Sequence, residues 1–297
     1  MLIYVAEKNE IHPSAIKLLK DNGHRLLFSL KNENYKNIEV IFIRTYTKLD
    51  KKLLNSFVNL KYILRAGAGI DNIDIQEVQR RNIKIITSPG SNANSVAEFV
   101  VGIMIFLIKN INEQSARLHK GEWRDKSLMG DDLNGKVLGL VGCGAVGKLL
   151  VKKLHGFEVN FLGYDPYLDD VTLKDFGIEK VSLQNLLKKS DIISLHLPLT
   201  PETANMFALK EFKKMKKNVI FINTSRGKLV NDKDLIYALN KKIIAKAAVD
   251  VFESEPIINK KFLSVKNLFL TPHIAAFTTN SNLEMSLRAA QNFISSL

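Results

Sequence analysis

Cysteine is almost absent from this chain of 297 residues, whose only thiol is that of Cys143. A single cysteine excludes an intrachain disulfide and fits a reducing compartment. Long hydrophobic runs are also missing, because the longest, residues 99–108, is too short to span a bilayer and predicts a buried helix. Residues 1–10 lack the basic-then-apolar pattern of a signal peptide. We therefore expect a cytoplasmic protein without a membrane partner.

Acidic residues are few relative to basic ones, since 30 Asp and Glu stand against 43 Lys and Arg and give a net charge of +13. Such an excess is typical of nucleic-acid-binding proteins, or else it reflects a lysine-rich surface. The lysines are scattered, aromatic residues are not interleaved with them, and no nucleic-acid-binding motif is present. We therefore expect no nucleic-acid partner, while the positive field favours a small anionic substrate.

Internal repeats, low-complexity segments and long linkers are absent too, whereas short β-rich runs alternate with helical stretches along the chain. This alternation predicts parallel sheets covered by helices. The first series of expected strands comprises residues 2–5, 39–43, 62–64 and 83–86. The second series comprises residues 137–141, 159–164, 191–195, 219–222, 245–249 and 268–270.

A long helical stretch from Asn94 to about Lys120 separates the two series and is expected to connect two domains. The first domain comprises residues 1–93 together with the helical residues 280–297, which we expect to pack back onto it. The second comprises residues 94–279. We therefore predict an α/β protein with two Rossmann-like or flavodoxin-like parallel-sheet domains and a cleft where the chain crosses twice between them.

A glycine motif follows the expected strand at 137–141. Gly142, Gly144 and Gly147 form G-x-G-x-x-G, and a helical stretch continues to His155. The first glycine permits a tight turn, the second lets the backbone approach a pyrophosphate, and the third lets the helix pack closely on the strand. The helix N-terminus offers N–H groups and partial positive charge to phosphates. This context predicts a dinucleotide site.

A carboxylate follows at the end of the next expected strand, where Asp165 lies roughly 20 residues beyond the glycine motif. At this position a carboxylate accepts hydrogen bonds from the adenosine ribose and repels a 2′-phosphate. We therefore predict NAD as the cofactor and residues 94–279 as an NAD-binding Rossmann domain. Cys143, at a variable position of the motif, is expected to pack rather than react.

Three later segments lie at or just past strand ends and supply an arginine, a carboxylate and a histidine: Arg226, Glu255 and His273. Ligands of open α/β sheets bind outside the carboxyl ends of the strands, so all three are expected at one crevice. An arginine fork suits a substrate carboxylate, and a histidine suits the proton that leaves a hydroxyl as hydride leaves. A neighbouring glutamate would orient the imidazole.

The chain resembles the D-isomer-specific 2-hydroxyacid dehydrogenase family over nearly its whole length. The resemblance rests on GCGAVG at 142–147, HLPLTPET at 196–203, NTSRG at 223–227, DVFESEP at 250–256 and TPHIAA at 271–276. It implies that Arg226, Glu255 and His273 form the catalytic triad, with Glu255 rather than Glu253 as its glutamate. It also implies further cofactor contacts at Ala145, Val146, Leu197, Thr224, Ser225 and Asp250, the last near the nicotinamide carboxamide.

Within the family, residues 65–74 and 89–98 are most similar to the D-3-phosphoglycerate dehydrogenases, which implies a substrate (catalytic) domain at 1–93 plus 280–297. The small-residue loop suggests close backbone approach, so its N–H groups are expected to bind a substrate carboxylate: Ala66, Gly67, Ala68 and Gly69. Arg44 and Arg65 are candidates for a phosphate, or else they are ordinary surface or packing residues. No metal is expected.

The resemblance implies NAD-dependent interconversion of a D-2-hydroxy acid and its 2-oxo acid. We expect 3-phosphoglycerate and 3-phosphohydroxypyruvate as the substrate pair. Hydroxypyruvate, glyoxylate or another 2-oxo acid is the alternative, and an NAD(H)-sensing protein without catalytic activity is a more distant one. The resemblance also implies a homodimer in which residues 112–131 embrace the partner. Because the sequence stops at Leu297, we expect no C-terminal regulatory domain.

Overall fold

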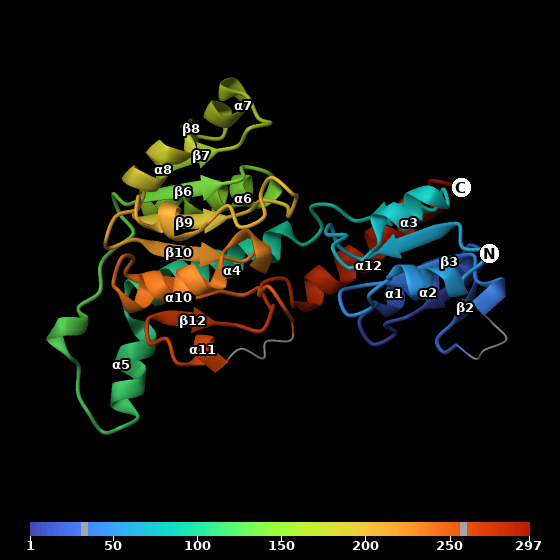
Figure 1. Cartoon of the computed structure of the whole chain (residues 1–297), viewed down its shortest axis with the longest axis horizontal. Coiled ribbons are helices and arrows are strands. Elements are labelled where there is room, and N and C mark those ends of the chain that lie inside the picture. Colours follow the sequence, from blue (N-terminus) through green and yellow to red (C-terminus); the bar gives the residue numbers. More distant parts are fainter. Residues whose placement is uncertain (31–34, 256–259) are drawn as a thin grey trace. The chain divides into compact units, whose positions relative to one another are not determined.

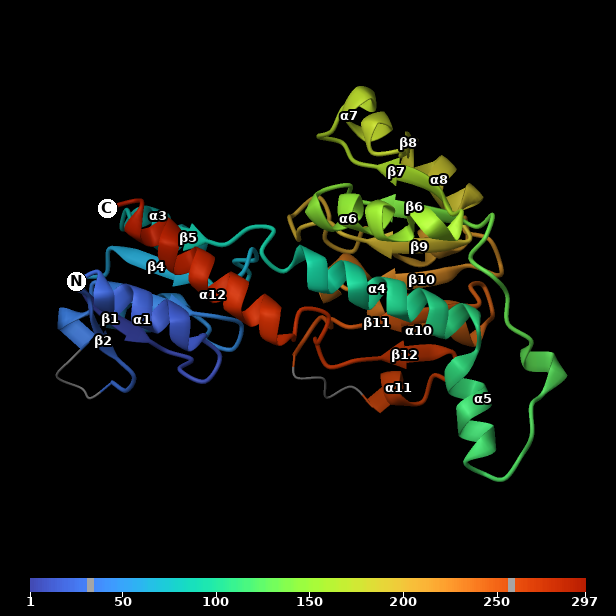
Figure 2. The same cartoon turned by 180° about the vertical axis from the view of Figure 1, so that it is seen from behind.

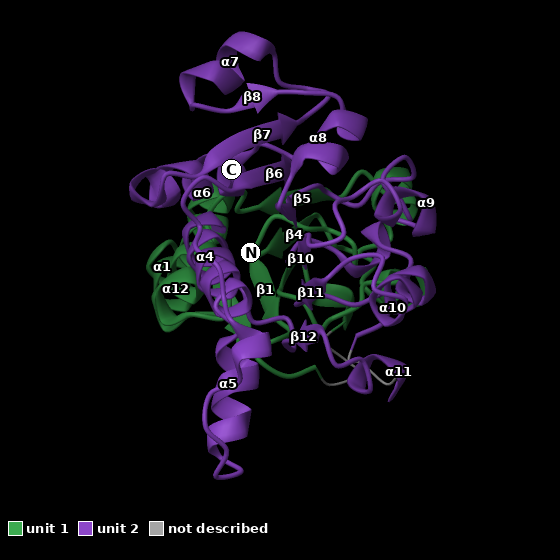
Figure 3. Ribbon diagram, turned by 90° about the vertical axis from the view of Figure 1, so that its left-hand side faces the viewer, with its two compact units in different colours: residues 1–92, 276–297 green, residues 93–275 purple. Residues whose placement is uncertain are grey.

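Residues 1–30, 35–255 and 260–297 are described by a computed structural model, which divides into two compact units (Figure 3). Unit 1 comprises Met1–Asn92 and Ala276–Leu297, and unit 2 comprises Ala93–Ala275. Each unit has its own wholly parallel sheet, of five strands in unit 1 and seven in unit 2. The predicted α/β class with two parallel sheets is confirmed.

The sheet of unit 1 has the strand order β2-β1-β3-β4-β5. Its strands are β1 (Leu2–Val5), β2 (Arg25–Leu27), β3 (Val40–Ile43), β4 (Tyr62–Arg65) and β5 (Lys84–Thr87). Its helices are α1 (Pro13–Asp21), the 3-10 turn η1 (Tyr35–Asn37), α2 (Lys51–Ser56), α3 (Ile75–Arg80) and α12 (Thr279–Ile294). Asp50 and Asp74 begin α2 and α3 as N-caps, because their carboxylates accept otherwise unpaired backbone N–H groups.

Two apolar layers cover the sheet of unit 1. On one face, α1 and the C-terminal α12 pack on each other, α1 on β2 and α12 on β4 and β5, with Phe293 and Ala289 of α12 buried in the same cluster as Ile3 and Val5. The other face packs against α2 and α3 around Leu54. The last helix of the chain therefore completes the core of the unit formed by the first residues (Figure 1).

The sheet of unit 2 has the order β12-β11-β10-β9-β6-β7-β8. Its strands are β6 (Val137–Val141), β7 (Asn160–Tyr164), β8 (Glu179–Lys180), β9 (Ile192–Leu195), β10 (Ile220–Asn223), β11 (Lys246–Val249) and β12 (Leu268–Leu270). The central strands β9 and β10 are buried along their whole length, as apolar runs covered on both faces should be. The strand order reverses between β6 and β9, where open α/β sheets bind ligands.

Helices cover both faces of this sheet, as the opposite views of Figures 1 and 2 show. The helices are α4 (Ala93–Ile108), α5 (Ile111–Leu118), α6 (Ala145–Leu154), α7 (Asp170–Asp175), α8 (Leu183–Lys189), α9 (Leu209–Phe212), α10 (Asp232–Asn240) and α11 (Lys260–Leu263). The 3-10 turns are η2 (Lys126–Leu128), η3 (His155–Phe157) and η4 (Gly227–Leu229). One face carries α4 packed on α6, and the other carries α8, α9 and α10.

The single helix predicted from Asn94 to about Lys120 is wrong, because the chain breaks between α4 and α5 and bends by 61°. Asn110 adopts a left-handed conformation with φ of 54°, which ends α4. Lys246 donates from Nζ to Leu107 O at 2.9 Å and also to Asn110 Oδ1. Among the described residues, no single helix is long and apolar enough to cross a membrane, although this bent pair has the required length and composition.

Candidate active site

The glycine turn joins β6 to α6 at the point where the strand order reverses. Gly142 has a φ of +92°, and a Cβ there would lie 2.7 Å from the backbone oxygen of His196, just past β9. A Cβ on Gly147 would lie 3.0 Å from Gly142 O, so the helix packs tightly on the turn. A Cβ on Gly144 would meet nothing within 4 Å, which leaves open space in front of the helix.

The N-terminus of α6 suits an anionic ligand. Its N-cap is Gly144, which has no side chain to accept from the first N–H groups of the helix, those of Ala145 and Val146 among them. Helix N-termini of this kind bind phosphates through N–H groups and the helix dipole. With the open space at Gly144, these residues fit the pyrophosphate of NAD.

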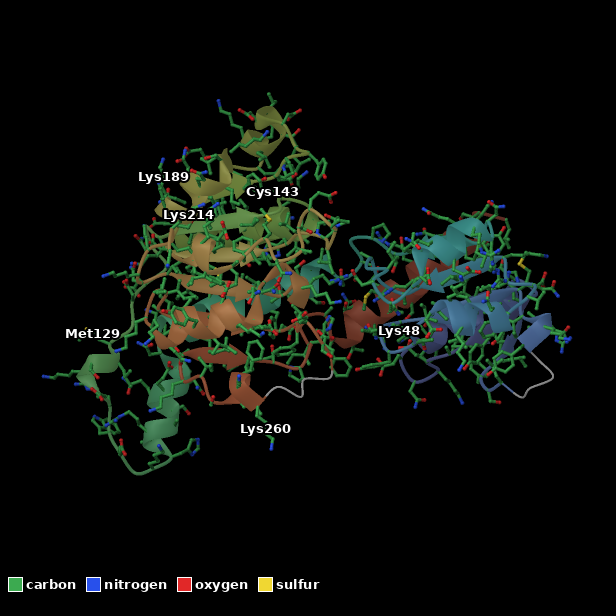
Figure 4. The ribbon with its side chains drawn as sticks, in the orientation of Figure 1. Lys48, Met129, Cys143, Lys189, Lys214 and Lys260 are labelled. Atoms are coloured by element: carbon green, nitrogen blue, oxygen red, sulfur yellow. The ribbon has the colours of Figure 1, made fainter. Side chains whose placement is uncertain are left out.

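Asp165 lies beside this turn, directly after β7. Its Oδ2 accepts the Cys143 N–H at 2.9 Å, and its Oδ1 accepts the Tyr167 N–H at 2.9 Å. Each carboxylate oxygen can accept more than one bond, so the group can also take ribose hydroxyl donors. Cys143 is fully buried, burial raises the pKa of its thiol to about 12, and it packs under the turn (Figure 4).

The ends of β9 and β10 supply the next predicted cofactor contacts. Ser225 donates from Oγ to Leu197 O and thereby ties the two strand ends together. Thr224 is buried, and its Oγ1 has no hydrogen-bond partner among the described residues. An unsatisfied buried hydroxyl is uncommon, and a ligand at this edge would satisfy it. The residues present therefore fit a bound dinucleotide.

His196 is a residue whose side chain the motif HLPLTPET did not lead us to single out. Its Nε2 is buried without a partner among the described residues. Burial lowers the pKa of His196 to about 3, so its imidazole is neutral at ordinary pH. His196 follows β9 directly, and its backbone lies against Gly142 of the glycine turn. This position is the one feature that distinguishes it from a packing histidine.

A buried carboxylate organises the loop that follows β12. Asp250 accepts hydrogen bonds from Thr271 Oγ1 at 2.5 Å and from the Ile274 and Ala275 N–H groups at 2.8 Å each. Burial raises its pKa, and these bonds partly offset the effect. The same turn holds His273 at a φ of +55°, a conformation that few residues other than glycine adopt. The loop is thus fixed around His273.

Glu255 and His273 are in direct contact. His273 Nδ1 lies 2.8 Å from Glu255 Oε2, and Glu255 Oε1 accepts the Phe252 N–H at 3.0 Å. Burial raises the pKa of Glu255, but the bond and charge of His273, with a contribution from Arg226, hold it below its usual value. Because Nδ1 is engaged, Nε2 is the ring nitrogen left for a ligand.

The loop of Arg226 lies close to the loop before Glu255, and Arg226 donates from Nη1 to Ser225 O at 2.6 Å while its charge lowers the pKa of Glu255. A Cβ on Gly227 would lie 1.9 Å from the Phe252 carbonyl carbon, so only glycine permits the contact. Asn223 shapes the turn before it, since Nδ2 donates to Arg226 O at 2.9 Å and Oδ1 accepts the Ser225 N–H at 3.1 Å. The sequence motif contains Asn223, but its role as organiser was not predicted.

Unit 1 holds the other predicted residues, on loops that follow the paired ends of β3 and β4. The Ala66 N–H donates to Ile43 O at 3.0 Å, and the Gly67 N–H donates to Ser88 Oγ at 2.7 Å. These two N–H groups are therefore already engaged within the unit. Those of Ala68 and Gly69 make no hydrogen bond to another described residue, so only half of the predicted loop is left to bind a carboxylate.

The two arginines proposed for a phosphate are turned toward their own unit. Arg44 is buried, and its Nη1 lies 3.3 Å from Glu10 O and 3.4 Å from Glu10 Oε2. Arg65 folds over its own loop, where Nη1 donates to Ala66 O at 2.6 Å. Arg44 thus contacts Glu10 within unit 1, and its role as a phosphate ligand stays a prediction.

Comparison with known proteins identifies the class. Residues 101–275 match the family model described as "D-isomer specific 2-hydroxyacid dehydrogenase, NAD binding domain". The chain belongs to this family. The match contains the glycine turn and also Arg226 and the contacting pair Glu255 and His273.

Three known proteins illustrate the similarity. D-3-phosphoglycerate dehydrogenase of Methanocaldococcus jannaschii is 36% identical over 283 residues, which are 93% of this chain and 54% of that protein. Glyoxylate reductase of Thermococcus litoralis is 37% identical over 269 residues, 88% of this chain and 81% of that one. The structure of Aquifex aeolicus D-lactate dehydrogenase with NAD and lactic acid is 28% identical, with a TM-score of 0.87 over 100% and 96% of the two chains. The chain thus spans about half the length of the phosphoglycerate dehydrogenase it matches.

Proposed function

We propose that this protein is an NAD-dependent dehydrogenase that interconverts a small D-2-hydroxy acid and its 2-oxo acid. The observation that most directly supports this is the 2.8 Å contact between His273 Nδ1 and Glu255 Oε2 at the same sheet edge as the glycine turn. NAD, when bound, supplies the hydride acceptor. A reaction that removes hydride from a carbon must also remove the hydroxyl proton, and the proposed acceptor of that proton is His273.

The proposed role of each residue follows from the contacts in unit 2. His273 Nε2 accepts the proton of the 2-hydroxyl, and Glu255 stabilises the imidazolium through Nδ1. Arg226 binds the substrate carboxylate, for which a planar guanidinium is suited. Asp250 holds the His273 turn in its left-handed conformation and so keeps the imidazole in place.

The substrate is the finer part of the proposal. A phosphoglycerate dehydrogenase relative favours the 3-phosphoglycerate and 3-phosphohydroxypyruvate pair, whereas a glyoxylate reductase of equal similarity favours an unphosphorylated acid. Arg44 is paired with Glu10, so this arginine would have to leave that carboxylate to bind a substrate phosphate.

NADH oxidation by the purified protein tests the proposal with 3-phosphohydroxypyruvate, hydroxypyruvate, glyoxylate and pyruvate. We expect turnover of at least one. A kcat/KM for 3-phosphohydroxypyruvate tenfold above the others would support the phosphorylated substrate. Binding of NADH without turnover of any acid would contradict the reaction and favour the NAD(H)-sensing alternative.

We also propose that the protein is a homodimer in which α5 and residues 119–131 contact a second copy. Figure 1 shows α5 extending away from the sheet of unit 2, and α5 has no buried residue. This segment exposes large apolar side chains: Ile111, Leu118, Trp123 and Met129. It is nevertheless ordered by polar contacts, because Gln114 exchanges two hydrogen bonds with the Asp125 backbone at 3.1 and 3.2 Å.

Light scattering after size exclusion tests this proposal. We expect the mass of a dimer and a shift toward the monomer in Trp123→Ser, since large apolar side chains at the centre of interfaces contribute most of the binding energy. Val171→Ser, which removes another exposed apolar side chain of unit 2, is the matched control. A monomeric unsubstituted protein would contradict the dimer.

A further inference from the structure

Exposed lysines gather at the amino edge of the sheet of unit 2, where the strands begin. In a wholly parallel sheet the chain returns to this edge before every strand, so the ends of the helix-to-strand connections meet there. The connections before β9, β10, β11 and β12 supply these lysines, and those four strands are neighbours in the sheet. Figure 4 labels Lys189 at this end of unit 2. The set, called here the lysine strip, has seven members, all exposed: Lys188, Lys189, Lys213, Lys217, Lys241, Lys242 and Lys266.

The positive charge of the lysine strip has no acidic counterpart among the described residues. None of its members forms an ion pair with another residue that the structure describes. The strip lies in residues 188–191, 213–219, 241–245 and 264–267, in which Asp191 is the only carboxylate. Asp191 is already engaged, because it binds Lys216 Nζ at 2.8 Å and accepts the Val137 N–H at 3.0 Å. In contrast, Lys136, before β6 at the same edge, is paired with Asp131.

The ends of the helices account for only part of this charge. A lysine in the last turn of a helix is stabilised by the partial negative charge there, as Lys188 and Lys189 are in α8. Lys217 and Lys266 lie several residues beyond α9 and α11, where this effect has faded. Lys242 follows the C-cap of α10 with a φ of 53°, a position at which glycine avoids a conformational cost. The strip therefore carries more charge than the helix ends need.

The chemistry of the lysine strip selects the kind of partner. Residues 188–191, 213–219, 241–245 and 264–267 expose no large apolar or aromatic side chain. The strip thus lacks the anchors of a stable protein interface, the apolar face of a membrane-bound helix and the rings on which unpaired bases stack. Compact ammonium groups suit phosphates. Neighbouring strands lie about 4.8 Å apart, so four connections extend over roughly 14 Å. A duplex presents a phosphate about every 1.7 Å of its axis, so several fit this length.

We propose that the lysine strip binds the phosphate backbone of a double-stranded nucleic acid without reading its sequence. The expectation of no nucleic-acid partner depended on the scatter of the lysines along the chain, and the parallel topology gathers them in space. The glycine turn follows the carboxyl end of β6, at the opposite edge of the same sheet. A duplex on the strip and NADH at the turn therefore bind independently. This inference does not depend on the proposed reaction.

Fluorescence anisotropy of a labelled DNA duplex, titrated with the intact protein at several salt concentrations, tests the proposal. The logarithm of the association constant should fall linearly with that of the salt concentration. We expect a slope of about −4 to −6, since each neutralised phosphate contributes about −0.9. Replacing one lysine in each of three connections, in Lys189→Ala/Lys217→Ala/Lys241→Ala, should make the slope shallower by roughly three, about one for each lysine.

The matched control is Lys17→Ala/Lys52→Ala/Lys233→Ala, which removes the same charge from three exposed lysines of α1, α2 and α10 outside the strip. It should keep the slope of the unsubstituted protein. Saturating NADH should change the Kd for the duplex less than twofold, because the two sites lie at opposite edges of the sheet. The strip variant should also keep the kcat of NADH oxidation.

Several outcomes would overturn the proposal. Absence of duplex binding at about 50 mM salt, where phosphate contacts are strong, would remove it. Equal changes of slope in the strip variant and the control would assign the binding to the general positive field of the protein. Displacement of the duplex by NADH would place the nucleic acid at the dinucleotide site. Tighter binding of a single strand would require base stacking that the strip lacks, and binding to phosphatidylserine vesicles but not to the duplex would assign the strip to a membrane surface. Loss of NADH oxidation with duplex binding intact would contradict the proposed function alone.

Discussion

The two units each place a loop of small residues after a parallel strand, and the two loops use their glycines differently. In unit 2, Gly142 is required because a Cβ would strike the backbone of His196. In unit 1, Gly67 has a φ of +136°, and a Cβ would lie 1.9 Å from Nη1 of Arg65, a flexible side chain. One loop thus lies against a neighbouring strand end, and the other against its own arginine.

The difference extends to the backbone donors. The glycine turn of unit 2 continues directly into α6, so its N–H groups point out of a helix end that no side chain caps. The loop of unit 1 uses the N–H groups of Ala66 and Gly67 within its own unit. A run of small residues therefore predicts a close approach of the backbone, but not which group approaches or how many donors are left for a ligand.

The largest effect on turnover should come from His273 in unit 2, the proposed proton acceptor. We expect His273→Ala to lower kcat by roughly 10²–10⁴-fold, since it removes the proton acceptor, while the Kd for NADH stays within about twofold. Stopped-flow turnover and NADH fluorescence titration measure the two quantities. His155→Ala, an exposed histidine just past α6, is the control. Equal losses of kcat and NADH affinity would assign His273 to cofactor binding instead.

Substitutions in the glycine turn should have the next largest effect. Gly142 and Gly144 distinguish a glycine needed for packing within the chain from one needed for the approach of the ligand. Gly142→Ala should lower both Tm and NADH affinity, because its Cβ has no room and its φ is positive. Gly144→Ala should keep the Tm, since its Cβ meets nothing within 4 Å of the chain, yet weaken NADH binding about tenfold or more. Full NADH affinity in Gly144→Ala would show that the pyrophosphate does not approach this residue.

The same substitution in unit 1 should have a smaller and different effect. Gly67→Ala strains a residue with φ of +136° and displaces the Arg65 guanidinium. We expect KM for the 2-oxo acid to rise about tenfold and the Kd for NADH to stay unchanged. Measuring KM for the 2-oxo acid and Kd for NADH on one preparation shows whether the loop of unit 1 affects the substrate, the cofactor or both. A change in NADH affinity alone would contradict the assignment of this loop to the substrate.

Most strands of both sheets were predictable because their apolar runs are bounded by turn residues, as at Val137–Val141. The two that were missed are short and lie at sheet edges: β2 (Arg25–Leu27) has no buried residue, and β8 comprises only Glu179 and Lys180. Their pairing is set by the neighbouring strands β1 and β7, which a local pattern does not contain.

The motifs also named Glu255 and His273, which are in contact in unit 2, because both follow strand ends and all strands are parallel. They did not reveal what holds those residues. The left-handed turn at His273 and its anchoring by Asp250 depend on contacts between β11 and the loop after β12. The engagement of Arg44 by Glu10 depends likewise on tertiary structure, which is why the sequence left the arginine open as a phosphate ligand.

The smallest effect concerns which dinucleotide unit 2 accepts. Asp165→Asn removes the negative charge and keeps one oxygen, which can accept the Cys143 or the Tyr167 N–H but not both, so the Tm is measured beside the kinetics to show that the turn is still folded. Without that charge, a 2′-phosphate is no longer repelled, and we expect the ratio of kcat/KM for NADH to that for NADPH to fall about tenfold, which corresponds to roughly 1.4 kcal/mol. Asp170→Asn is the control, because it removes an equal charge from an exposed side chain nearby that pairs with Lys180. If both variants lower the ratio equally, the general field of the unit selects the cofactor. If neither does, Asp165 has no part in that selection, and its function is to fix the glycine turn through the two N–H groups it accepts.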